Sequence, residues 1–516
     1  MGIKIYNTMT RKIEEFIPLN PPYVNMYACG ITVYDEAHIG HGYQAIIFDT
    51  IRQYLNYKGY KVKYVRNFTD IDDKIIKKAN ETKRNFFEIT EYYINDSLND
   101  LRKLKVKDAD IQPKVTDHID DIIKFIQVLI DKEMAYVSDG EVLFDTRKFS
   151  QYGKLSKISI EENISENDSE EEKKRKKHFS DFSLWKPAKP NEPSWNSPWG
   201  KGRPGWHIEC SVMAMKYLGK TLDIHGGGQD LVFPHHENEI AQSEAYSGEE
   251  FAKYWIHNGL VMVNGQKMSK SLGNFFTIKD ILKIYQPDII RFIVFSNHYS
   301  SPINFSLDIF KIASKRVYYF YSTLEKIFEM SIKFRFTNSF LIDESNIIKE
   351  IDVSLLKSDL NNFKNNNNFK NYFNIIDEMK SKFIEYMDDN FNTAKVIGLF
   401  SEIFKKINDF IDSKYFKDDL KVSFLIYFYS EFIKIANVLN IFNENPSIFI
   451  NEFKLRFLKE LNIDENYLNQ KIKERIEYKK NKQYEKADKI RDELLEKYNI
   501  KLLDTKEGTN WMINFS

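Results

Sequence analysis

Short strand-like runs and amphipathic runs alternate along the first half of the chain. Residues 24–28, 61–67 and 220–224 are short runs typical of strands, and Gly30 is expected to end the first of them. After His41 the apolar positions recur near a period of 3.6, which predicts a helix; these positions are Ile46, Ile47, Thr50, Ile51 and Leu55. The alternation predicts an α/β fold with an open sheet, in which ligands bind at the carboxyl ends of the strands.

An insertion is expected between the second and third of these strands. Apolar spacing within 116–133 predicts a helix, and residues 135–144 predict a hairpin with Asp139-Gly140 at its turn. Residues 181–210 are rich in Trp, Pro and Gly, which favours a structured loop over a helix or a central strand. The acidic residues Asp70, Asp72 and Asp73 are expected to cap and begin a helix.

The last third of the chain is mainly helical in its pattern. Residues 309–332 and 395–443 predict amphipathic helices, which indicates a helix bundle. The Asn-rich stretch 361–374 predicts a loop or an insertion. Residues 471–497 predict one charged helix, and residues 500–513 predict two short strands around Glu507-Gly508.

A histidine pair, His38 and His41, stands where the first predicted strand gives way to the helix. A helix N-terminus carries unpaired N–H groups and partial positive charge, so this position suits a phosphate. Two imidazoles three residues apart can share a face and donate to phosphate oxygens, and Gly40 leaves room for a base or sugar to approach the backbone. A lone His-x-x-His also occurs by chance on protein surfaces.

Composition limits the classes of protein that fit. The 516 residues include 75 basic and 75 acidic ones, so any contact with nucleic acid must come from local patches. The charged N-terminal residues predict no signal peptide, and we expect no run to be long and apolar enough to span a membrane. A cytoplasmic enzyme of three or four domains is therefore expected.

Four dispersed side chains form a plausible zinc set, because zinc takes thiolate, imidazole and carboxylate ligands. They are Cys29, Cys210, His235 and Glu239. Pro234 is expected to open a helix, in which His235 and Glu239 are four residues apart and share a face. On spacing alone, two buried structural cysteines are the alternative. Alternative ligands, or hydrogen-bond partners of the ligands, are His207, His225 and His236.

A lysine-rich element follows the turn Asn264-Gly265 and reads Lys267-Met268-Ser269-Lys270-Ser271. By itself such a cluster is usually a solvated loop. After a His-Ile-Gly-His segment, in this order, it resembles the KMSKS motif that accompanies HIGH in class I aminoacyl-tRNA synthetases. The sequences ACG at 28–30, GWHIEC at 205–210 and FPHHENE at 233–239 are similar to those of the cysteinyl-tRNA synthetase family.

The resemblance implies a role for each candidate residue. Catalysis falls to His38, His41, Lys267 and Lys270, with the lysines neutralising charge on the departing pyrophosphate. The ATP site comprises Gly40, His38, His41, Gly227, Asp230 and Lys270, with Asp230 facing the ribose. The amino-acid site comprises Gly30, Thr69 and Trp206. The match also strengthens the interpretation of Cys29, Cys210, His235 and Glu239 as zinc ligands. It implies one zinc ion per subunit and magnesium bound with ATP.

The resemblance covers nearly the whole chain and implies a Rossmann-like parallel-sheet catalytic domain with an insertion, a helical bundle and a small anticodon-binding domain. The implied ranges are 1–120 and 201–255 for the two catalytic halves, 121–200 for the insertion, 256–310 for the KMSKS-bearing stem-contact region, 311–455 for the bundle and 456–516 for the last domain. A basic run at 173–177 is typical of a solvated loop, with contact to an acceptor stem as the alternative.

The implied activity is cysteine–tRNA ligation, in which cysteine is activated with ATP to cysteinyl-adenylate and transferred to the 3′ end of tRNA(Cys). Zinc would select the substrate thiol. The expected partners are tRNA(Cys), ATP and cysteine, with no membrane, and a monomer is expected. The alternatives are a cysteine ligase acting on a small amine, a tRNA-binding paralogue without catalysis, and another class I synthetase. The predicted C-terminal domain disfavours a ligase acting on a small amine. The complete HIGH and KMSKS motifs disfavour a paralogue without catalysis.

Overall fold

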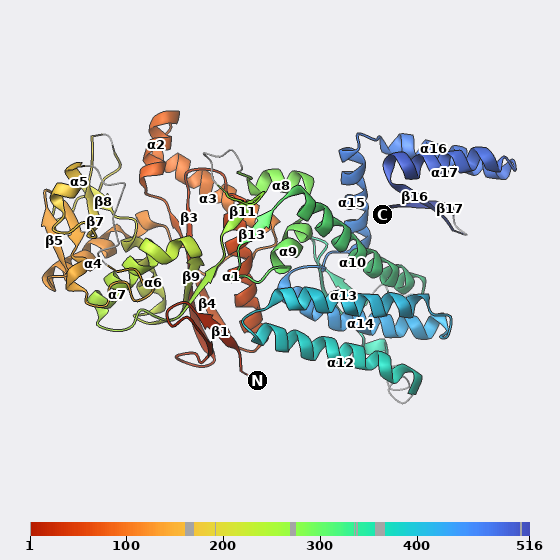
Figure 1. The fold of residues 1–516 in the computed structure, drawn as a ribbon, viewed down its shortest axis with the longest axis horizontal. Helices are drawn as coiled ribbons and strands as arrows, with labels where there is room; N and C mark the ends of the chain where they lie inside the picture. The colour runs from red at the N-terminus through yellow and green to blue at the C-terminus, as the bar shows by residue number, and fades with distance from the viewer. Residues whose placement is uncertain are drawn as a thin grey trace. The chain divides into compact units, whose positions relative to one another are not determined.

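The structure is a computed structural model that describes residues 2–159, 170–190, 192–268, 275–334, 336, 339–356, 367–505 and 508–515. The chain folds into two compact units (Figure 1). The first comprises residues 1–281, 294–306 and 381–398, and the second comprises residues 282–293, 307–380 and 399–516. The finer six-part division of the chain remains a prediction.

A parallel sheet is the framework of the first unit. Its strand order is β10-β9-β3-β4, with β3 at Tyr23–Thr32, β4 at Lys61–Thr69, β9 at Leu222–Gly228 and β10 at Ala252–Asn258. All neighbouring pairs are parallel, so the carboxyl ends of the strands meet at one edge. This edge brings together the end of β3, Thr69 and the glycines of β9.

Two strands extend further than the sequence predicts. Gly30 does not end β3, which continues to Thr32 with a register shift after Ala28, and β9 runs through its three glycines to Gly228. Side chains would prevent this close packing, because a Cβ at Gly30 would overlap the backbone oxygen of Asn67, and one at Gly226 would overlap that of Ile256. The glycines therefore allow both strands to continue past the residues at which the sequence pattern predicts that they end.

Helices cover both faces of the sheet. α1 (Ile39–Tyr57) contacts β4 on one side, where the Arg52 guanidinium lies over the Tyr64 ring. α6 (Ile208–Leu218) contacts β3 and β4, and Glu209 of α6 accepts a hydrogen bond from Thr69. Since neighbouring side chains of a strand point to opposite faces, Tyr64 and Thr69 mark the two sides. On the α6 side, one hydrophobic core cluster packs residues of the sheet and α6 with residues of the insertion.

The insertion is a mixed helical and antiparallel layer. Between β4 and α6 come α2 (Asp73–Thr82), α3 (Phe86–Lys103), a 3-10 turn (Val115–His118), α4 (Ile119–Asp131) and a short α5 (Glu170–Arg175). Its sheet has the order β5-β6-β7-β8, with strands at Ala135–Ser138, Glu141–Phe144, Phe182–Pro187 and Gly202–Pro204. The predicted hairpin is confirmed as β5–β6. α4 packs against α6 and α7 (Glu237–Ser247).

The prediction of a loop throughout 181–210 is wrong for two strands and for residues 208–210, which begin α6. Phe182–Pro187 forms β7, an interior strand of the antiparallel sheet, and Gly202–Pro204 forms β8. The prolines of β7 and β8 stand at the last position of each strand, where no further ladder hydrogen bond from the ring nitrogen is needed. The described residues between the strands form irregular backbone, as the composition predicts.

Smaller strands complete the first unit. β1 (Lys4–Asn7) and β2 (Lys12–Glu15) pair antiparallel, and β11 (Val261–Val263) lies between β12 (Gln266–Lys267) and β13 (Ile303–Phe305). β12 leads into the lysine-rich element, and α8 (Ile278–Ile284) begins soon after it.

A helix bundle forms much of the second unit, as predicted. The helices are α9 (Pro287–Phe295), α10 (Leu307–Lys333), α12 (Asn367–Asp388), α13 (Thr393–Asp412), α14 (Asp418–Leu439) and α15 (Pro446–Glu460), with a strand pair β14 (Phe340–Ile342) and β15 (Ile348–Ile351). The Asn-rich loop prediction is wrong for residues 367–374, which belong to α12; residues 361–366 lie outside the described chain.

α14 corrects another expectation. By length and composition this helix is apolar enough to cross a membrane, contrary to the expectation from the sequence. However, 83% of its most apolar window is buried inside the protein. Contacts with α10 and β15 account for part of this burial, as expected for the core helix of a bundle.

The C-terminal residues form a helical hairpin and a strand pair. The single helix predicted at 471–497 is wrong, because α16 (Glu465–Lys480) ends and α17 (Tyr484–Tyr498) begins after a short turn. Leu468 and Ile472 of α16 pack with Ile490 and Leu494 of α17 in one cluster. β16 (Ile500–Thr505) and β17 (Gly508–Ile513) are antiparallel, as predicted, although Glu507 of the expected turn lies outside the described residues.

Candidate metal centre and active site

Four buried donor side chains meet near the carboxyl edge of the sheet. Cys29 comes from β3, Cys210 from α6, His235 from the turn before α7 and Glu239 from the first turn of α7. One ligand atom from each lies within 4.8 Å of the others. The two sulfur atoms are 3.7 Å apart, and the Cys29 Sγ lies 3.3 Å from a Glu239 oxygen. The structure thus brings together all four side chains predicted as zinc ligands.

The backbone before α7 differs from the prediction but preserves the spacing. Pro234 does not open a regular helix: Val232–His236 forms a π-helical turn in which Phe233 is extended, and α7 begins at Glu237. An extended residue before proline is the sterically preferred arrangement. His235 and Glu239 still face each other, with 3.1 Å between His235 Nε2 and Glu239 Oε1.

Other histidines surround the four donors. His225 Nε2 lies 2.8 Å from the second Glu239 oxygen, and His207 Nδ1 lies 3.0 Å from His235 Nδ1. His236 Nε2 lies 3.3 Å from Cys29 Sγ, and its Nδ1 lies 2.7 Å from His257 Nε2. Cys29, His225 and His236 form a second close donor group, so the alternative ligands considered from the sequence also lie at this site.

Burial and neighbouring charges set the protonation of the cluster. Although burial opposes ionisation, His225 and His235 hold the pKa of the Glu239 carboxyl well below its usual range. Burial likewise opposes charge on His235, yet Glu239 and Cys210 raise its pKa to about 10. The contact with Cys29 lowers the pKa of the Cys210 thiol to about 6, whereas burial and Cys210 raise the pKa of Cys29. The cluster therefore holds an ionised carboxylate and a thiol that ionises readily.

This donor set fits a metal ion. Two sulfurs, an imidazole and a carboxylate are ligands that zinc accepts, and metal binding displaces the protons that such groups otherwise share. Burial lowers the pKa of His207 and His236, which keeps these neighbouring imidazoles neutral. His225 and His207 stand where partners that orient metal-bound side chains are usually found.

The histidine pair forms the start of α1, as predicted. His38 is the N-cap, and its Nδ1 accepts a hydrogen bond from the Gly40 N–H at 3.1 Å. His41 Nδ1 accepts in turn from the His38 N–H at 3.3 Å, and the two rings stack with centroids 3.5 Å apart. When Nδ1 of a neutral imidazole accepts, Nε2 carries the proton. Both rings therefore offer an Nε2–H donor at a helix N-terminus.

The histidine pair and the metal centre are neighbours. Cys29, Gly30, His41 and Gln44 border one small cavity of about 20 Å³. Gln44, one turn along α1, donates to the Cys29 carbonyl oxygen at 2.7 Å. A Cβ added to Gly228 would stand 3.9 Å from Gln44 Oε1, so the end of β9 also approaches the start of α1. The predicted ATP-site and metal-site residues thus share one region.

The glycine-rich segment has a close fit. A Cβ at Gly227 would stand 2.8 Å from Leu231 and 3.1 Å from the His236 ring, so glycine is needed for this packing. Asp230 is exposed in the turn that follows β9. Both lie at the carboxyl end of a central strand, where α/β sheets bind nucleotides.

The three predicted amino-acid contacts surround the metal centre. Gly30 N–H donates to Asn67 Oδ1 at 2.8 Å, and Thr69 Oγ1 donates to Glu209 Oε2 at 2.8 Å. The Trp206 ring is 40% exposed, with its centroid 4.6 Å from that of His235. Trp206 thus covers a metal-site histidine while keeping an open face.

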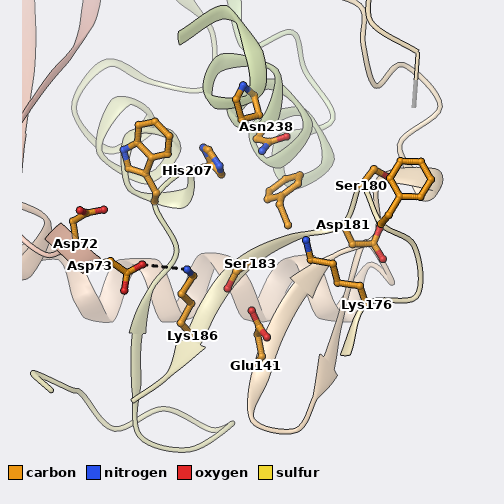
Figure 2. A pocket seen from close by; sticks show the side chains of 14 residues that line it. Asp72, Asp73, Glu141, Lys176, Ser180, Asp181, Ser183, Lys186, His207 and Asn238 are labelled. Carbon is orange, nitrogen blue, oxygen red and sulfur yellow. Dashed lines mark hydrogen bonds and ion pairs between the residues drawn. The ribbon is translucent and has the colours of Figure 1, made fainter. Parts of the chain in front are cut away.

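A pocket of about 300 Å³ opens beside Trp206 and His207. Figure 2 shows Lys186 reaching toward Asp73, with 3.4 Å between Nζ and Oδ2, while Glu141 and Lys176 stand elsewhere around the same space. Lys176 belongs to the basic run at 173–177, so part of that run lines a pocket. The mixed charges of the wall suit a polar ligand.

Of the two candidate lysines, the structure describes Lys267. It is exposed at the end of β12, and the next residue, Met268, places its Cε 3.4 Å from the position of a Cβ on Gly40. The lysine-rich element therefore begins against the histidine segment. Lys270 lies outside the described residues.

Sequence reasoning missed three polar residues of the site, of which Asn67 and Glu209 are buried and Gln44 is half-buried. Asn67 Oδ1 accepts from Gly30 and lies 3.7 Å from Cys210 Sγ, Glu209 holds Thr69, and Gln44 holds the Cys29 carbonyl. The burial of Glu209 raises its carboxyl pKa well above the usual range. Their positions gave a signal: Asn67 ends a run of strand residues, Glu209 adjoins Cys210, and Gln44 is three residues after His41.

Comparison with known proteins identifies relatives across the whole chain. Residues 15–315 match the family of tRNA synthetases class I (C) catalytic domain, and residues 382–443 match the DALR domain. The cysteine–tRNA ligase of Thermodesulfovibrio yellowstonii is 46% identical over 518 residues, covering 100% of both chains. That of Thermococcus gammatolerans is 45% identical over 511 residues, covering 99% of both.

Solved structures share the fold at low sequence identity. Methionyl-tRNA synthetase of Mycobacterium tuberculosis, in complex with methionyl-adenylate, superposes with a TM-score of 0.57 at 13% identity. The match covers 81% of this chain and 90% of that one. This likeness supports the predicted class I architecture of a parallel-sheet catalytic domain followed by helices.

Proposed function

Since the chain belongs to the cysteine–tRNA ligase family of class I tRNA synthetases, we propose that it activates cysteine with ATP and joins it to the 3′ end of tRNA(Cys). The observation that carries the proposal is the buried group of Cys29, Cys210, His235 and Glu239 beside the helix start at His38. A thiol-selecting centre next to a phosphate-binding helix end is what this reaction requires.

The first step needs positioning and charge stabilisation rather than a general base. The carboxylate of cysteine is already ionised, and it attacks the α-phosphorus of ATP in line, which forms cysteinyl-adenylate and releases pyrophosphate. The Nε2–H groups of His38 and His41 donate to phosphate oxygens, and Gly40 and Gly227 let the nucleotide approach the backbone. Asp230 accepts from the ribose, and magnesium accompanies ATP.

Lys270, supported by Lys267, neutralises charge on the departing pyrophosphate. In the second step a ribose hydroxyl of the terminal adenosine attacks the adenylate carbonyl, which forms the ester and releases AMP. Replacing Lys270 by alanine should lower the rate of adenylate formation, and an unchanged rate of cysteine-dependent ATP–pyrophosphate exchange would remove this role.

The proposed metal is one zinc ion, held by Cys29, Cys210, His235 and Glu239. When bound, zinc supplies a soft Lewis acid that prefers a thiolate to a hydroxyl. An apolar pocket alone separates such near-isosteres by only about 1–3 kcal/mol. The chain's own residues complete the amino-acid site: Trp206 covers one side, Thr69 is held by Glu209, and Gly30 is held by Asn67.

The remaining parts have proposed roles that follow the family. The last domain, residues 456–516, binds the anticodon, and residues 256–310 contact the tRNA stem. The protein acts as a cytoplasmic monomer. A stabilising cap is the alternative role for the C-terminal domain.

The test is charging of total tRNA with labelled cysteine, with labelled serine in parallel. Cysteine esterified to tRNA without serine supports both the ligase activity and selection of the thiol. If cysteine drives ATP–pyrophosphate exchange but no tRNA is charged, a ligase acting on a small amine becomes the better assignment. If cysteine drives no ATP–pyrophosphate exchange, a tRNA-binding protein without catalytic activity becomes the better assignment.

A further inference from the structure

An ion-pair cluster joins the residues after the lysine-rich element to the histidine segment, and the reaction described above does not use it. Lys279, in the first turn of α8, donates from Nζ to Glu36 Oε1 at 3.2 Å and to Asp96 Oδ1 at 2.5 Å. Glu36 lies two residues before His38, and Asp96 lies on α3. One ammonium group therefore links three segments that are distant in the sequence.

The backbone on either side of Lys279 pairs with the histidine segment directly. Thr277 forms a bridge with His38, the Ile39 N–H donates to the Phe276 carbonyl at 3.1 Å, and the Ile278 N–H donates to the Ala37 carbonyl at 2.9 Å. Ile278 is fully buried. Any shift of residues 276–278 must therefore break backbone contacts with Ala37, His38 and Ile39.

The surroundings of Lys279 favour a fixed cation. Its side chain is 25% exposed, and that of Asp96 is 14% exposed, so the pair is shielded from water more than ordinary surface pairs are. Asp100, one turn after Asp96 on α3, is completely buried. Neither of its carboxylate oxygens has a hydrogen-bond partner among the described residues. The negative charge of Asp100 helps to raise the pKa of Lys279. Burial and Asp96 raise the pKa of Asp100 to about 6.

We propose that Lys279 is a positioning residue, whose ion pairs with Glu36 and Asp96 hold residues 276–278 against the histidine segment and so keep His38 in place during adenylate formation. It touches no substrate and acts through the backbone of residues 276–278. Charge-assisted hydrogen bonds are stronger than neutral ones, which suits a fixed connection of α8 to α3 and to the histidine segment. The inference rests on the proposed function.

The main comparison is between Lys279→Met and Lys279→Arg, with Lys283→Met as the control. Methionine keeps the apolar stem and loses the charge, arginine keeps the charge, and Lys283 is an exposed lysine one turn further along α8. We expect Lys279→Met to lower kcat of cysteine-dependent ATP–pyrophosphate exchange about tenfold or more, with KM for cysteine changed less than about twofold. Lys279→Arg should recover most of kcat, and Lys283→Met should match the wild type.

A double-substitution cycle separates positioning from folding. Asp96→Asn and Glu36→Gln should each lower kcat, and Asp96→Asn combined with Lys279→Met should cost much less than the product of the two single effects, because both remove one pair. Thermal unfolding is measured for every variant. If Lys279→Met does not fold, the kcat values of Asp96→Asn and Glu36→Gln test the inference in its place. Unchanged kcat in folded variants, whether or not their Tm falls, overturns the inference, as does loss that arginine does not recover. An inactive wild type instead overturns the proposed function.

Discussion

Glu237 ties the insertion to the helix that carries Glu239. Its side chain is completely buried at the first position of α7. One carboxylate oxygen accepts from the Gly153 N–H at 2.8 Å, and the other accepts from the N–H groups of Leu155 and Ser156 at 3.1 and 2.7 Å. Replacing Glu237 by glutamine keeps the shape but turns one of these acceptors into a donor.

The cost follows from the number of hydrogen bonds. In either orientation of the amide, at least one buried N–H faces the new NH₂ group and loses its acceptor, which costs about 1–3 kcal/mol. The remaining hydrogen bonds lose their charged acceptor, and each weakens by about 0.5–1 kcal/mol. The sum is a local destabilisation of about 2–5 kcal/mol.

Hydrogen exchange measures this local change directly. The amides of residues 153–156 should exchange about 30-fold faster or more in Glu237→Gln, since about 1.4 kcal/mol corresponds to a factor of ten. The control is Glu249→Gln, which breaks the exposed 2.8 Å pair with Lys220 and should leave the exchange of residues 153–156 unchanged. Equal exchange of this segment in wild type and Glu237→Gln would show that the carboxylate does not anchor it.

Two further predictions concern the metal centre and the second unit. Cys210→Ser should reduce bound zinc from about one ion per chain to almost none, because a hydroxyl replaces a thiolate ligand; metal analysis of the purified protein checks this, and full zinc occupancy would exclude Cys210 as a ligand. Burial raises the pKa of Glu325 to about 7 although Lys454 opposes the shift. The folded pKa lies above the unfolded value, so its contribution to stability is lost as the pH rises through about 7. Glu325→Gln should therefore have the same Tm as the wild type near pH 5 and a higher Tm than the wild type at pH 8. A variant whose Tm equals that of the wild type at both pH values would contradict this expectation.

Local chemistry allowed several features to be predicted from the sequence. The 3.6 period fixes α1, and His38 caps it with its own ring, so the helix end proposed to bind phosphate depends on neighbouring residues only. The i, i+4 spacing of His235 and Glu239 ensures that they face each other, even though α7 begins later than predicted. The hairpin at Asp139-Gly140 likewise follows from its turn residues.

Other features depend on residues that are far apart in the chain. Local propensity does not distinguish one helix from two at 471–497, and packing of Ile472 and Leu494 across the turn favours the hairpin. Glycine weakens an isolated strand, yet β9 continues through its glycines because only they fit beneath the neighbouring strand and α1.

The identity of the four candidate metal ligands was indicated by the sequence through family resemblance, but their meeting was decided by the fold. The chain has ten histidines, and spacing alone does not show which of them reach the two cysteines. The parallel sheet brings Cys29 of β3 beside Cys210 of α6, and it sets His225 against Glu239 and Asn67 against Gly30. These contacts arise because buried polar groups must find partners within the folded core, and only the tertiary structure determines which partners are within reach.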